Sequence, residues 1–133
     1  MMRSILAVLT GFVTWLVVAT LGNFVIRALL PGYVAAGPTM SFSLAMMVAR
    51  LGLGVVSSLV AGFACSAVAR GHVAAVYAFA ALLVLCFLPI HYNLWEKFPL
   101  WYHVFFLVTL APLVLWGAAV QRRWLAMPAV PRI

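Results

Sequence analysis

Four long, mainly apolar runs without a charged residue constrain this chain more than any other feature. They cover residues 4–26, 51–69, 73–90 and 104–120, and are 23, 19, 18 and 17 residues long. A helix rises about 1.5 Å per residue, so roughly 20 residues cross a hydrocarbon core about 30 Å thick. Backbone groups inside lipid must be hydrogen-bonded within the protein, which favours helices. The runs therefore predict four transmembrane helices.

The composition places these helices in a single membrane domain. Hydrophobic residues make up 68% of the 133 residues and charged residues only 7%, whereas about a quarter of an ordinary soluble domain is charged. A membrane β-barrel would alternate apolar and polar residues, and the four runs do not. We predict an all-α, polytopic membrane protein, a four-helix bundle formed by residues 1–133. The expected spans are about 4–28, 43–69, 73–90 and 100–120.

Arginine and lysine favour the cytoplasmic side of a membrane, so their distribution predicts the orientation. If both termini are cytoplasmic, five basic residues lie inside: Arg3, Arg70, Arg122, Arg123 and Arg132. Three then lie outside: Arg27, Arg50 and Lys97. This excess predicts cytoplasmic N- and C-termini, in a plasma membrane or a bacterial inner membrane. An outer aromatic belt would comprise Tyr33, Tyr92, Trp95, Trp101 and Tyr102.

The second run carries small residues at every fourth position. One row consists of Gly54, Ser58, Gly62 and Ser66, and a parallel row of Ser57, Ala61, Cys65 and Ala69. Small residues let membrane helices approach closely. We expect this helix to lie at the centre of the bundle or to form a dimer seam, and the two alternatives stay open. The third run offers Ala74, Ala78 and Ala81 as the expected partner face.

Polar side chains gather at the outer ends of the predicted helices. They are Asn23, Arg27, Arg50, His91, Asn93, Glu96, Lys97 and His103. One interpretation is an anchor belt, in which Arg27 and Arg50 reach the headgroup region. The other is an outward-facing pocket, in which the arginines bind a phosphate or carboxylate group of a ligand. In both interpretations Glu96 is expected where Arg27 and Arg50 could meet it.

The second interpretation yields candidate ligand-binding residues: Asn23, Arg27, Arg50, His91, Glu96 and His103. A lipid headgroup or a quinone would suit such a pocket. No cofactor or metal is predicted, although His91 and His103, at the facing ends of two neighbouring helices, are possible haem ligands. We identify no set of catalytic residues.

Two further classes of function have little support in the sequence. None of the four runs contains the membrane-embedded carboxylate that proton-coupled carriers generally use. The basic residues are divided between two sides of the membrane and form no patch for nucleic acid.

We expect a small non-catalytic protein that acts through helix contacts, as an accessory subunit of a membrane complex or as a homo-oligomer. The alternative is a binder or carrier of an amphipathic anionic ligand. Membrane lipids and a protein partner within the membrane are the expected partners.

Overall fold

The computed structural model describes residues 1–128, which form five helices and no strand. The helices are α1 (Met2–Leu29), α2 (Tyr33–Ala36), α3 (Leu44–Ala69), α4 (Val73–Asn93) and α5 (Leu100–Ala126). All except α2 are long and apolar enough to span a membrane. The predicted all-α bundle of four transmembrane helices is confirmed, and the fold is that of a multi-pass integral membrane protein. Arg132, expected at the cytoplasmic end, lies outside the described residues.

The helices differ from the expected spans at two further places, besides α4, which ends at Asn93 and not at residue 90. Residues 30–38 were expected to form only a connection, but they contain the short helix α2, which follows Gly32 in a left-handed conformation with φ of 79°. At the other end of the chain, α5 continues beyond residue 120 to Ala126. Ser43 caps α3, because its hydroxyl accepts a hydrogen bond from the Met46 N–H at 3.3 Å.

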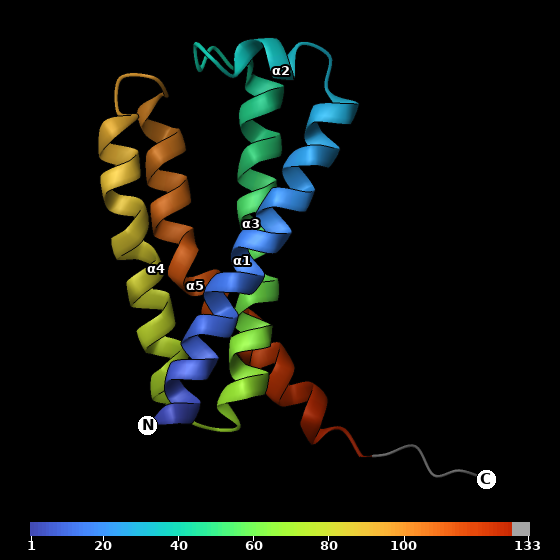
Figure 1. Ribbon diagram of the computed structural model, residues 1–133, viewed down its shortest axis with the longest axis vertical. Helices are drawn as coiled ribbons and strands as arrows, with labels where there is room; N and C mark the ends of the chain where they lie inside the picture. Colours follow the sequence, from blue (N-terminus) through green and yellow to red (C-terminus); the bar gives the residue numbers. More distant parts are fainter. Residues whose placement is uncertain (129–133) are drawn as a thin grey trace, which may run out of the picture.

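Helix α3 lies at the centre of the bundle and packs against α1 on one side and α5 on the other, while α4 packs mainly against α5 (Figure 1). One end of the bundle carries residues 30–43 and 94–99, and we name it the loop end. The opposite end carries the N-terminus, the turn 70–72 and the end of α5, and we name it the terminal end (Figure 1). Both ends of the described chain therefore lie at the same end of the bundle.

The small residues of α3 pack inside the chain. A Cβ atom at Gly62 would overlap the backbone of Val114, and one at Gly117 would overlap the backbone of Leu59. The α3 and α5 backbones are therefore in direct contact, which is how membrane helices gain packing energy without a hydrophobic driving force. Nearer the terminal end, the Ser66 hydroxyl donates a hydrogen bond to Gln121 Oε1 at 2.9 Å.

The expected partner face of the third span is wrong. Ala74, Ala78 and Ala81 are exposed on the outside of α4. The buried face is instead formed by Ala75, Val76, Phe79, Ala80 and Leu83. The side chains of this face are larger than alanine at three of the five positions, because they fill the space between α1 and α5. There Phe79 packs edge-on against Phe12 at a centroid distance of 5.2 Å.

Helix α5 changes direction in its middle, in the part that contains Pro112 (Figure 1). Proline has no N–H and cannot bond the carbonyl four residues earlier, so a bend there is expected. The first part of α5 runs along α4, and the second part crosses α3 at Gly62 and Gly117. The bend thus separates a tightly packed terminal half from the loop half of the bundle.

Candidate functional site

A cavity of about 290 Å³ lies in the loop half, between α1, α3, α4 and α5. Its polar lining consists of Asn23, Tyr33, Arg50, His91 and Tyr102. The apolar lining includes Trp15, Leu53, Phe87, Ile90 and Phe106. The cavity therefore combines hydrogen-bonding groups with an apolar wall, as small-molecule sites in proteins commonly do.

Arg50 is the centre of the polar wall. Its Nη1 donates a hydrogen bond to the Tyr33 hydroxyl at 2.8 Å, and its Nε donates to the Tyr102 hydroxyl at 3.3 Å. The Tyr33 hydroxyl in turn donates to Asn23 Oδ1 at 3.0 Å. The network joins α1, α2, α3 and α5, and it fixes the guanidinium on the cavity wall.

Aromatic rings enclose the same guanidinium. Its central carbon lies 4.8 Å from the centroid of the Phe42 ring and 5.9 Å from that of Phe98. Phe98 also stacks on Tyr102 at a centroid distance of 4.5 Å. Cation–π contacts hold a cation without neutralising it. Its hydrogen-bond partners are neutral hydroxyls, so they supply no counter-charge to the guanidinium. Half-buried Arg50 therefore presents a positive charge to the cavity.

His91 and His103 form a buried pair beside the cavity. Their Nδ1 atoms are 2.7 Å apart, and the two side chains are 5% and 1% exposed. One Nδ1 must donate and the other accept. Nε2 of His103 is buried and has no partner among the described residues. Since a buried N–H without an acceptor is rarer than an unused acceptor, we assign the shared proton to His103 Nδ1. His91, which lines the cavity, then carries its proton on Nε2 and can donate it.

This pair does not suit haem in the observed arrangement. Two nitrogens on opposite sides of a metal ion lie roughly 4 Å apart, since metal–nitrogen bonds are about 2 Å long. His91 and His103 are instead bonded directly to each other at 2.7 Å. Both rings would have to turn before they could hold an iron between them.

The structure places the six candidate residues in two groups. Asn23, Arg50 and His91 line the cavity, and His103 contacts it through His91. Arg27 and Glu96 are exposed and do not line it. The expected meeting of Glu96 with Arg50 is not what the structure shows, because the hydrogen-bond partners of Arg50 are two tyrosines.

The two tyrosines were assigned to the wrong place. Tyr33 and Tyr102 were expected in the outer aromatic belt, but they are 4% and 5% exposed and point into the bundle, toward Arg50. Trp15 was also missed as a site residue. Its indole Nε1 donates to the Ser58 hydroxyl at 3.2 Å and its side chain lines the cavity. An indole N–H inside an apolar run needs a buried acceptor, and this signal was available in the sequence.

Comparison with known proteins adds no relative to this description, because no protein-family model, curated protein or solved structure matches the chain. The chemistry of the site is therefore taken from its own residues. A guanidinium, two phenolic hydroxyls and an imidazole meet an apolar wall across one cavity. Such a set can bind and orient a molecule with an anionic or hydrogen-bond-accepting head and an apolar body.

Proposed function

We propose that this protein binds an amphipathic molecule whose anionic headgroup pairs with Arg50. The observation that carries the proposal is the half-buried guanidinium on a cavity wall, with neutral hydrogen-bond partners. A buried charge is costly without a counter-charge, and polar groups inside membranes usually serve a function. An anionic ligand would supply the missing charge.

The hydrogen bonds of Arg50 support binding through a carboxylate or phosphate. Tyr33 and Tyr102 use two of the five N–H donors that a guanidinium carries. Three donors remain, one on Nη1 and two on Nη2, and neighbouring N–H groups of Nη1 and Nη2 suit the paired oxygens of such a headgroup. His91, with its proton on Nε2, adds a second donor on the same cavity.

The shape of the site supports a ligand whose chain leaves toward the bilayer. About 290 Å³ is at the lower limit of ligand pockets, which measure about 300–1,000 Å³. It suits a headgroup and the first part of a chain. Helices α1 and α4 touch at Trp15 and Phe87, whose ring centroids are 4.8 Å apart, and diverge toward the loop end (Figure 1). We propose that the chain of the ligand passes between them.

The experiment measures binding of radiolabelled palmitate to protein purified in non-ionic detergent. Arg50→Gln should lower palmitate affinity roughly tenfold to a hundredfold, because a charge-assisted hydrogen bond contributes about 1.5–3 kcal/mol. Arg27→Gln is the matched control. It removes the same charge from the loop end of the bundle, but Arg27 is exposed and does not line the cavity. Its affinity should stay within about twofold of the parent.

Competition with a neutral analogue tests whether the site requires an anionic headgroup or accepts any amphipathic molecule. Hexadecanol should compete at least tenfold more weakly than hexadecyl phosphate, because it offers Arg50 no charge. Equal competition would indicate a neutral hydrogen-bonding head, such as that of a quinone, and would contradict the proposal. Unchanged palmitate binding by Arg50→Gln would contradict it as well.

The other role expected from the sequence, an accessory subunit or a homo-oligomer, has less support. It depended on the small-residue row of α3, and Gly62 and Ser66 of this row pack against α5 of the same chain.

We also propose that the terminal end is cytoplasmic, in a plasma membrane or a bacterial inner membrane. Arg3, Arg70, Arg122 and Arg123 belong to that end, whereas Arg27, Arg50 and Lys97 belong to the loop end. The cavity then faces the outer half of the bilayer.

A further inference from the structure

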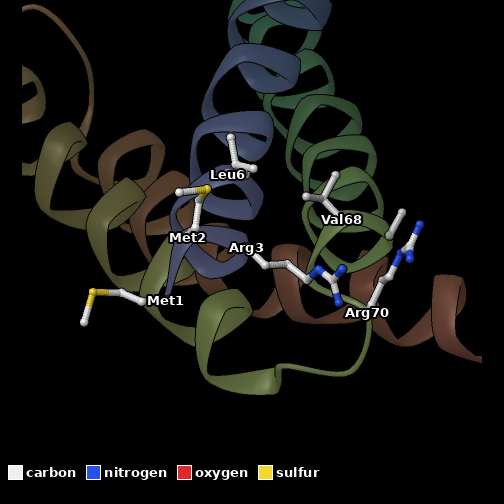
Figure 2. A pocket seen from close by; sticks show the side chains of 7 residues that line it. Met1, Met2, Arg3, Leu6, Val68 and Arg70 are labelled. Carbon is white, nitrogen blue, oxygen red and sulfur yellow. The ribbon is translucent and has the colours of Figure 1, made fainter.

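A second basic site lies at the terminal end, far from the cavity of Arg50. A groove of about 650 Å³ runs between the first turns of α1 and the end of α3 (Figure 2). Arg3 of α1 and Arg70 of α3 both line it. Figure 2 shows the Arg3 side chain extending toward the α3 side of the groove, where Arg70 lies.

The end of α3 brings Arg70 to this position. Arg70 is the C-terminal cap of the helix and has a left-handed backbone, with φ of 46° and ψ of 54°. Its N–H still bonds the Ser66 carbonyl at 3.2 Å, and Gly71, with φ of 89°, turns the chain toward α4. Arg70 is thereby held beside the first turn of α1 and does not continue along the α3 axis.

Two positive side chains on one groove repel each other unless an anion lies between them. The one acidic side chain in the sequence, Glu96, is in the turn at the loop end and is too far away to fill that role. The remaining side chains of the lining are apolar and include Met2, Leu6 and Val68. Leu6 and Val68 lie further along the two helices than the arginines (Figure 2). The groove therefore has a basic rim and an apolar floor.

We propose that this groove binds an anionic phospholipid of the leaflet at the terminal end. Its phosphate lies between Arg3 and Arg70, and one acyl chain lies along Leu6 and Val68. Guanidinium groups bind phosphate oxygens in pairs, and basic pockets between transmembrane helices bind anionic headgroups on the cytoplasmic side. This site is independent of the cavity in the loop half, because the two have no lining residue in common.

The test is native mass spectrometry of the detergent-purified protein with added phosphatidylglycerol, and with phosphatidylcholine for comparison. One phosphatidylglycerol should stay bound, and the double variant Arg3→Gln/Arg70→Gln should lower its retention at least tenfold. The matched control is Arg122→Gln/Arg123→Gln. It removes the same charge from the same end of the bundle, but neither residue lines this groove. Its retention should stay within about twofold of the parent.

Three results would overturn the proposal. Equal losses in the two double variants would show attraction to overall charge and no defined site. Equal retention of phosphatidylcholine would show that the groove does not select lipids with a net negative charge. Displacement of phosphatidylglycerol by millimolar inorganic phosphate would show that the groove takes free phosphate and needs no acyl chain. In the Arg50→Gln background, Arg3→Gln/Arg70→Gln should cause the same loss of retention, so failure here is distinguishable from failure of the proposed function.

Discussion

The terminal half and the loop half of the bundle are held together by different means. In the terminal half, Gly62 and Gly117 let the backbones of α3 and α5 touch. In the loop half, the helices are separated by large rings and polar groups around a cavity, with Arg50 on its wall. Helix α3 belongs to both halves.

Gly54 and Gly62 show how one small-residue row serves both halves. A Cβ at Gly62 would meet the backbone of α5, whereas one at Gly54 would meet the ring of Phe106 at 2.9 Å. A glycine therefore makes room for a neighbouring helix backbone in the terminal half and for an aromatic side chain in the loop half. Binding regions are commonly drawn from the less stable parts of a fold, and we infer that the terminal half supplies the rigidity that the loop half lacks.

The largest effect on stability should come from the terminal half. Gly62→Leu places a side chain where the Val114 backbone lies, so α3 and α5 must separate. The free energy of unfolding should fall by about 3 kcal/mol, the upper part of the range for overpacked cores. Denaturation in mixed detergent micelles, followed by circular dichroism, measures this change.

Gly52→Leu is the control for this substitution. A Cβ at Gly52 meets no atom within 4 Å, so the unfolding free energy should change by at most about 1 kcal/mol, the scale of helix propensity. Similar losses in the two variants would refute the claim that close backbone contact stabilises the terminal half.

The loop half should respond in the opposite manner, with a small loss of stability and a larger loss of binding. Tyr102→Phe removes the hydroxyl that accepts from Arg50 Nε. Interhelical hydrogen bonds in membranes contribute about 0.6 kcal/mol, and the unfolding free energy should fall by about that amount. Palmitate affinity should fall severalfold, because the guanidinium is no longer fixed on the cavity wall.

Tyr92→Phe provides the comparison for this smaller effect. Tyr92 belongs to the same end of the bundle but is 80% exposed, so neither stability nor palmitate affinity should change measurably. If Tyr102→Phe were as destabilising as Gly62→Leu, the two halves would not differ in the way described. If it left palmitate affinity intact, Tyr102 would have no part in orienting Arg50.

The sequence predicted the helices well because their signal is local. Each run contains its own evidence, in its length and its lack of charge. The packing direction was harder to predict, since buried and lipid-facing residues are both apolar in a membrane protein. Ala74, Ala78 and Ala81 were assigned to the inside for their small size, yet they are exposed.

The candidate site was predicted only in part, and for a similar reason. Arg50 was identified from its register with Gly54, and both residues line the cavity. Tyr33 and Tyr102 were assigned to an interfacial belt, because the partner that draws them inward belongs to another helix. Glu96 was chosen for its charge and its position at the outer ends of the helices, but it lies exposed in the turn between α4 and α5. Distant pairing of this kind cannot be inferred from one sequence.

Covalent labelling inside the membrane tests the central claim most directly, namely that a ligand enters the cavity of the loop half. A palmitate with a diazirine close to its carboxylate is irradiated with the protein, and the labelled peptides are identified by mass spectrometry. The account predicts labels on cavity residues such as Leu53 and Ile90, lost in Arg50→Gln and retained in Arg27→Gln. Labels confined to exposed outer positions such as Val60 and Leu82, equal in all three proteins, would contradict it.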